Sequence, residues 1–109
     1  MSEPSTDVIQ GTLDLLILKA LSLEPMHGFG ITGRIEQITR GVFRVNPGSL
    51  LLAFQRMERA GWIESEWRQT ASNRRAKFYA ITRNGRKQLR AERAEWERRS
   101  TAIARLLEA

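Results

Sequence analysis

Residues 46–82 read NPGSLLLAFQRMERAGWIESEWRQTASNRRAKFYAIT, and this stretch decides the fold. Asn46 is a residue type that caps helix N-termini, and Pro47 suits the first helical position. A helix is therefore predicted from Pro47 to about Ala60, where Gly61 ends it. Two segments with the alternation typical of strands follow directly, so a β-hairpin is expected after the helix.

The predicted helix has one apolar and one largely polar face. The residues expected to be buried are Leu50, Ala53, Phe54 and Met57. The opposite face carries Ser49, Leu52, Gln55, Arg56 and Arg59. Glutamine can bind the edge of adenine, arginine can bind guanine or a phosphate, and serine can add a hydroxyl contact. The same side chains also suit a merely solvated helix face, so the helix alone does not decide between the two interpretations.

The predicted hairpin has strands at Trp62–Arg68 and Arg75–Ile81, around a loop at Gln69–Asn73. Its second half opens with three cations, Arg74, Arg75 and Lys77. Because the arginine fork matches the geometry of phosphate, we expect the hairpin to meet a polyanion. Aromatic side chains in the strands are expected to anchor the hairpin on the helices: Trp62, Trp67, Phe78 and Tyr79. Glu64 and Glu66 are expected to be solvated partners of arginines.

Two further helices are predicted upstream, at about Thr12–Leu23 and at Gly28–Ile38, from apolar residues at helical spacing. Residues 42–45 alternate and predict a very short strand. Three helices followed by a two-stranded hairpin form a winged helix-turn-helix. The fold class is thus mainly α with a small β-hairpin. Residues 9–82 form the winged domain, and residues 1–8 are expected to be a loose tail.

The last predicted helix occupies residues 83–109 and is capped by Thr82. Apolar residues recur on one narrow seam: Leu89, Trp96, Ile103, Leu106 and Leu107. A thin seam on a long charged helix suits another helix better than a broad core, so this helix is expected to mediate a homodimer. Trp96 either only packs this dimer or also lines a pocket for a small aromatic effector.

Composition narrows the possible functions. The chain has 109 residues and a net charge of +6, which favours nucleic acid as a partner. It has no cysteine, which excludes disulfides and cysteine-based zinc sites. The N-terminus lacks the pattern of a signal peptide, and no apolar stretch is long enough to span a membrane. We therefore expect a cytoplasmic protein without membrane contact.

The motif GFGITG at residues 28–33 matches the G-x-G-x-x-G pattern of dinucleotide-binding sites. That pattern works after a strand of a βαβ unit, whereas here it follows a predicted helix and a turn. Tight turns and close helix packing explain these glycines better. His27 is the only histidine and is expected to be structural or to face a phosphate. No catalytic constellation, metal site or cofactor site is predicted, so an enzyme is not expected.

Several segments together resemble the PadR family of bacterial transcriptional regulators. They are GTLDLLIL at the first helix, MHGFGI at the turn, GSL at the start of the third helix, and RRAKFYAIT followed by RNG at the hairpin. The resemblance covers about Gly11 to Ala109. It implies a homodimeric winged helix-turn-helix repressor on a pseudo-palindromic operator, with the third helix in the major groove of double-stranded DNA and the basic wing on the backbone or minor groove. It also implies that the C-terminal helix packs on the partner, often against its first helix.

The chain departs from the family at one place. Leu51 and Leu52 stand where the family usually has Tyr-Pro, so the tyrosine contact with the DNA backbone is absent. Leu52 could contact a thymine methyl instead, or pack in an altered dimer. An alternative function is a winged-helix module for protein interactions with only non-specific affinity for DNA. In that case no DNA sequence would be preferred above the salt-sensitive background.

Overall fold

The computed structural model describes the backbone of residues 6–109 and the side chains of residues 11–109. The elements follow the chain as α1 (Thr6–Leu23), β1 (Met26–His27), α2 (Gly28–Ile38), α3 (Pro47–Arg59), β2 (Ile63–Gln69), β3 (Arg75–Ile81) and α4 (Arg83–Glu108). This is the predicted winged helix-turn-helix with a long C-terminal helix. No helix within the described residues is long and apolar enough to cross a membrane.

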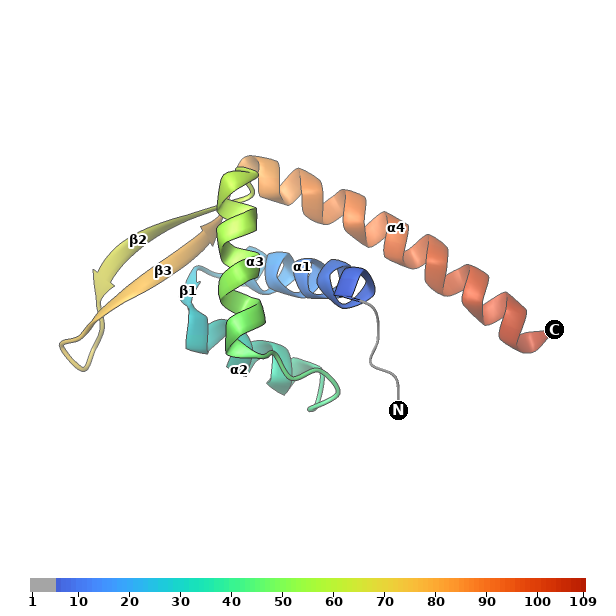
Figure 1. Cartoon of the computed structure of the whole chain (residues 1–109), viewed down its shortest axis with the longest axis horizontal. Helices are drawn as coiled ribbons and strands as arrows, with labels where there is room; N and C mark the ends of the chain where they lie inside the picture. The colour runs from blue at the N-terminus through green and yellow to red at the C-terminus, as the bar shows by residue number, and fades with distance from the viewer. Residues whose placement is uncertain (1–5) are drawn as a thin grey trace.

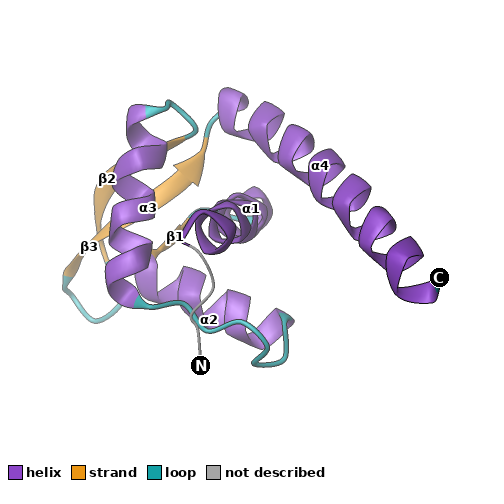
Figure 2. Cartoon of the chain, turned by 45° about the vertical axis from the view of Figure 1, so that its right-hand side comes forward, coloured by secondary structure: helices purple, strands orange, loops and turns teal. Residues whose placement is uncertain are grey.

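The core forms around α1, which lies among α2, α3 and α4 in Figure 2. Among residues 11–109, the largest fully buried side chains are Ile17, Leu18, Leu21, Ile31 and Met57. The apolar face predicted for α3 is buried as expected, since Leu50, Ala53, Phe54 and Met57 are all in the core. The opposite face of α3 is thereby turned outward. The helix itself lies beside the hairpin (Figure 1).

The prediction of a strand at residues 42–45 is wrong. The sheet has the order β1-β3-β2, and its third strand is Met26–His27, which pairs antiparallel with β3 through Met26↔Tyr79 and His27↔Phe78. Residues 42–45 pair with no strand and lie in the loop between α2 and α3, while β1 takes the edge of β3 opposite to β2. Alternation favours an extended backbone, but a strand also requires hydrogen bonds to a neighbouring strand.

The predicted boundary of the N-terminal tail is also corrected. Helix α1 begins at Thr6, so residues 6–8 are helical where a loose tail was expected. Residues 1–5 lie outside the described part of the chain. The predicted first strand is shifted by one residue, since β2 runs from Ile63 to Gln69. The bounds of α2 and β3 agree with their predictions.

Helix α4 leaves the body of the molecule. It starts at the base of the hairpin, passes α1, and its C-terminal half extends away from the other elements (Figures 1 and 2). Its N-cap is Thr82, as predicted, whose hydroxyl accepts a hydrogen bond from the Gly85 amide at 3.0 Å. An extended helix of this kind has one long side without intramolecular neighbours.

Candidate nucleic-acid interface

Helix α3 begins with the predicted cap. The Asn46 side-chain oxygen accepts hydrogen bonds from the amides of Gly48 (2.8 Å) and Ser49 (3.3 Å). This fixes where the helix starts and hence which side chains face outward. Four of the predicted contact residues are exposed on α3: Ser49, Leu52, Gln55 and Arg59. Leu52 is 68% exposed, although an apolar side chain gains nothing from water.

We call the hairpin (residues 63–81) the wing and its turn the wing tip. The N-terminal half of α3 lies beside the wing tip. A hollow of about 750 Å³ separates the two, lined by Leu50 and Leu51 of α3 and by Thr70, Ser72, Arg74 and Arg75 of the wing. Phe29, at the start of α2, lines the same hollow and is 87% exposed. Glu36 of α2 also lines it and is paired with Arg44. The wall formed by the wing carries cations, and the wall formed by α3 is apolar, so this open groove can receive the edge of a nucleic-acid strand.

The wing turn is shaped by its own backbone. Thr70 donates its amide to the Arg74 carbonyl at 2.7 Å, and Asn73 adopts a left-handed φ of 63°. Asparagine tolerates this conformation better than most residues. Arg74 follows directly and is exposed, as is Arg75. Neither forms an ion pair with any acidic side chain among residues 11–109.

The other wing cation is engaged within the chain. The Lys77 ammonium lies 3.7 Å from a Glu58 carboxylate oxygen of α3 and 5.8 Å from the centre of the Tyr79 ring. Its side chain is held between the strand and the helix. Lys77 is therefore less available to an anion than Arg74 and Arg75.

Only part of the expected aromatic anchor is in place. Tyr79 is buried and stacks on Phe54 at 4.0 Å between ring centres, and Phe78 meets His27 edge-on. Trp67 contradicts the prediction, since it is 59% exposed and lies beneath the Arg75 guanidinium at 5.3 Å from the ring centre. Trp67 pairs with Lys77 near the far end of the hairpin, away from the core residues Ile63 and Tyr79.

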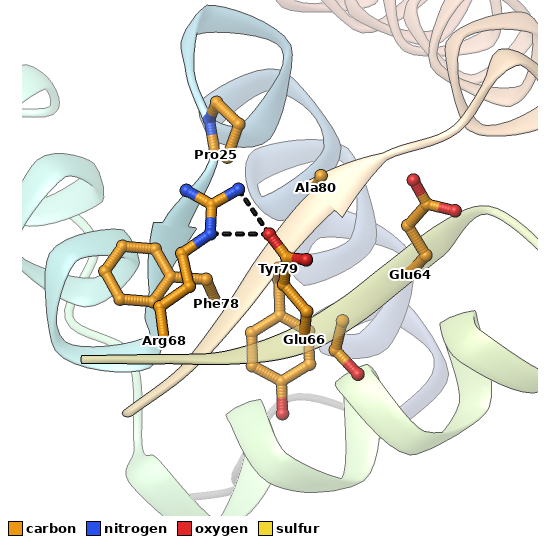
Figure 3. A pocket seen from close by; sticks show the side chains of 8 residues that line it. Pro25, Glu64, Glu66, Arg68, Phe78, Tyr79 and Ala80 are labelled. Atoms are coloured by element: carbon orange, nitrogen blue, oxygen red, sulfur yellow. Dashed lines mark hydrogen bonds and ion pairs between the residues drawn. The ribbon is translucent and has the colours of Figure 1, made fainter. Parts of the chain in front are cut away.

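The other face of the hairpin carries a local ion pair. Arg68 donates to Glu66 at 2.5 Å and lies over the Phe78 ring at 5.2 Å (Figure 3). These residues border a shallow hollow of about 360 Å³ next to Pro25. Glu66 is thus a partner of an arginine, as predicted, whereas Glu64 pairs with no arginine among residues 11–109.

The prediction that Arg56 lies on the solvated face of α3 is wrong. Its guanidinium donates two hydrogen bonds to the Asp14 carboxylate of α1, at 2.6 and 2.7 Å. Asp14 is buried, with 6% of its surface exposed. The hydrogen bonds from Arg56 to Asp14 raise the pKa of Arg56 above its ordinary value. A buried carboxylate requires a counter-charge, and this requirement turns Arg56 inward.

A third charged group reaches this pair from α4. Burial raises the pKa of Glu92 above its ordinary value of 4.5, and the Asp14 charge adds to the rise, while a hydrogen bond from Gln88 and the Arg56 charge oppose it. Gln88 donates to one carboxylate oxygen at 3.1 Å. The other oxygen is buried without a partner among the described side chains. Asp14, Arg56 and Glu92 thus connect α1, α3 and α4.

A pH dependence of stability follows from Glu92. Its pKa is higher in the folded than in the unfolded chain, so the folded chain holds more protons and loses stability as pH rises from about 4.5 through the raised pKa. We expect Glu92→Gln to be more stable than the wild type at neutral pH, with the difference shrinking in acid. Urea denaturation across this pH range measures it. Glu97→Gln, on the exposed side of α4, is the matched control, and a Glu92→Gln variant less stable at neutral pH would contradict the expectation.

His27 has a structural role that its position explains. Its Nδ1 accepts a hydrogen bond from the Gly30 amide at 3.0 Å and so caps α2. A Cβ on Gly30 would come within 3.3 Å of the Met26 Cβ, so glycine allows the close approach of β1 and α2. The GFGITG motif does follow a strand, but β1 has two residues and pairs antiparallel with β3, unlike the parallel strand of a dinucleotide site.

The apolar seam predicted on α4 divides into two parts. Leu89 is partly buried and packs against the chain's own core, and its contact with a second copy stays a prediction. The remaining four residues are exposed on the extended part of the helix, and they are Trp96, Ile103, Leu106 and Leu107. Trp96 lines neither of the two hollows described above.

Comparison with known proteins agrees with this architecture. Residues 17–91 match the model of the transcriptional regulator PadR-like family. An uncharacterised protein of Lysinibacillus sphaericus is 30% identical over 91 residues, which are 84% of each chain. The structure of a transcriptional regulator from Clostridium thermocellum superposes with a TM-score of 0.83 at 30% identity, over 92% of this chain and 97% of that one.

A PadR family transcription regulator from Clostridium difficile has the same fold. Its TM-score is 0.76 at 27% identity, over 87% of this chain and 97% of that chain. Fold, family match and relatives agree over most of the length. The chain therefore belongs to the PadR-like family of transcriptional regulators, which are DNA-binding winged-helix proteins.

Proposed function

We propose that the protein is a homodimeric repressor that binds a pseudo-palindromic operator in the bacterial cytoplasm. The observation that carries this proposal is the pair Arg74 and Arg75, exposed and without acidic partners among residues 11–109, beside the open N-terminal half of α3. In a helix-turn-helix this half of the recognition helix enters the major groove. The wing cations then lie where the phosphate backbone runs.

The exposed residues of α3 have distinct roles in this proposal. Gln55 suits a bidentate contact with adenine, and Ser49 a hydrogen bond with a phosphate near the helix N-terminus. Leu52 offers an apolar surface for the methyl group of thymine, which replaces the tyrosine–backbone contact of the family. Arg56 is withdrawn from the contact residues, because Asp14 already binds both ends of its fork.

The homodimer rests on the exposed apolar residues of α4. Trp96 and Ile103 lie seven positions apart, and each is more than half exposed. Residues at this spacing share one side of a helix, which suits packing on a helix of a second copy. Such a dimer presents two recognition helices to major grooves one helical turn apart, about 34–36 Å. An effector site lined by Trp96 would have to include residues of both copies.

Removing the wing cations should reduce affinity without changing sequence preference. We expect Arg74→Ala with Arg75→Ala to weaken binding to all duplexes by a similar factor. The slope of the logarithm of the binding constant against the logarithm of the salt concentration should become shallower by about 0.9 for each phosphate that the variant no longer neutralises. Fluorescence anisotropy over a salt series measures both effects. Lys77→Ala is the matched control and should change the slope less, since Lys77 is engaged by Glu58. An unchanged slope in the double variant would contradict the proposed docking.

Selection of duplexes from a random pool tests the function as a whole. We expect an enriched inverted repeat with half-sites one helical turn apart. The competing function is a protein-interaction module, which is favoured by three exposed apolar side chains, Phe29, Leu51 and Leu52. Retention of DNA without any enriched sequence, and only at low salt, would favour that module over the repressor.

A further inference from the structure

The positive charge of α4 is concentrated at its start. Residues 83–91 contain four cations and no acid, namely Arg83, Arg86, Lys87 and Arg90. Residues 92–109 contain four arginines and four glutamates and are therefore neutral. All four early cations are exposed. None forms an ion pair with an acidic side chain of residues 11–109, whereas Arg93, Arg98 and Arg99 further along are paired.

Helix stability does not explain this placement. The N-terminus is the positive end of the helix macrodipole, where acidic side chains are stabilising and basic ones are not. Helix α4 has no acidic residue in its first turn. Its exposed cations there repel both the dipole and one another. A function that requires positive charge accounts for an arrangement that local energetics disfavours.

Tertiary contacts place these cations at the C-terminal end of α3. The Thr82 amide donates to the Trp62 carbonyl at 3.0 Å, and the Thr82 hydroxyl donates to the Gly61 carbonyl at 2.6 Å. Gly61 closely follows the end of α3, and Figure 1 shows α3 ending next to the start of α4. Arg59, in the last turn of α3, is exposed as well. We call Arg59, Arg83, Arg86 and Lys87 the α3–α4 corner.

The wing tip and the α3–α4 corner therefore lie at opposite ends of α3. The wing tip borders Pro47 and Leu51 at the N-terminal end, and the corner begins with Arg59 at the C-terminal end. With 13 residues, α3 is about 20 Å long. The major groove is about 12 Å wide, so a helix of this length reaches both sides of it.

We propose that the α3–α4 corner binds the phosphate backbone of the DNA on the side of the major groove opposite to the wing. The inference rests on the proposed DNA binding and adds a second backbone contact from the first turn of α4. The wing and the corner together hold one half-site from both edges of the groove. The helix that carries the dimer contacts then also touches DNA, so its direction relative to α3 contributes to operator affinity.

Charge-removal variants test the corner. Arg83→Gln with Arg86→Gln and Lys87→Gln removes three charges, and Arg93→Gln with Arg98→Gln and Arg105→Gln is the control with the same change in net charge. The quantity measured is the slope of the logarithm of the binding constant against the logarithm of the salt concentration. For each corner that contacts a phosphate, we expect the corner variant to make this slope shallower by at least about 0.9. The control should keep the wild-type slope. Circular dichroism and sedimentation confirm that both variants keep their fold and oligomeric state.

Single methylphosphonate linkages locate the contact. Neutralising a phosphate on the side of the half-site away from the wing should weaken DNA binding by the wild type. It should leave DNA binding by the corner variant unchanged. If the wild type binds DNA and the corner variant keeps the slope and the methylphosphonate sensitivity of the control, the corner proposal is overturned while the proposed function stands. If the wild type shows no sequence preference in the random-pool selection, the repressor function itself fails.

Discussion

Replacing Gly85 by alanine should destabilise the protein by about 3 kcal/mol or more. A Cβ at this position would lie 2.0 Å from the Trp62 carbonyl oxygen and 2.7 Å from an Ile81 side-chain carbon. The obstructing oxygen belongs to the backbone and accepts the Thr82 amide. Relief therefore requires the start of α4 to move away from the base of the wing. That movement would break the contacts which orient α4 relative to α3.

Helix propensity predicts the opposite sign for this substitution. Alanine inside a helix is favoured over glycine by about 1 kcal/mol. Gly33→Ala in α2 is the matched control, because no atom outside its own helix lies within 4 Å of an added Cβ. It should be neutral or stabilising. Urea denaturation followed by circular dichroism compares the two variants, and a Gly85→Ala protein as stable as the wild type would refute the packing of α4.

Replacing Arg56 by alanine should destabilise the protein by about 3 kcal/mol, because it leaves the buried Asp14 carboxylate without a counter-charge. The effect stays near the lower end of the range for buried ion pairs, since the Arg56 side chain is about one-third exposed. Arg59→Ala, on the same helix and exposed, should change stability by no more than about 0.5 kcal/mol. Thermal or urea denaturation of both variants measures the contrast.

A double variant separates the structural role of Arg56 from a contact with DNA. Asp14→Leu with Arg56→Met replaces the buried pair by apolar side chains and should recover much of the stability. If Arg56 serves only the fold, this stable double variant should bind the operator nearly as tightly as the wild type. A stable double variant without the wild-type preference at one base position would show that Arg56 does contact DNA.

The elements of the winged helix could be predicted because their signals are local. The Asn46 cap and the following Pro47 determine where α3 starts, and the spacing of its apolar residues determines which face is buried. Thr82 likewise marks the start of α4. Each of these signals depends on residues within one or two helical turns. The wing strands were predictable for the same reason, since alternation is a property of neighbouring residues.

What local patterns missed at the candidate site concerns contacts that only the fold decides. Arginine is a residue type typical of the surface, so Arg56 was expected to be solvated. Its partner Asp14 lies 42 positions away in the sequence. Trp67 is aromatic and typical of a core, but the hairpin extends past the helices at that point. Leu89 fits the heptad seam, yet the path of α4 brings it against the chain's own core. No local pattern contains this information.

The sequence by itself determined the elements, the winged helix-turn-helix class and the net positive charge. Periodicity and capping depend only on neighbouring residues, and net charge is a sum over the sequence. Tertiary structure alone decided which cations remain free to bind an anion. Among residues 11–109, Arg56 and Lys77 are engaged by Asp14 and Glu58, whereas Arg74, Arg75 and the α3–α4 corner are not paired. The physical reason is that a charge is neutralised by whichever opposite charge folding brings within a few ångströms, and chain distance does not limit that choice.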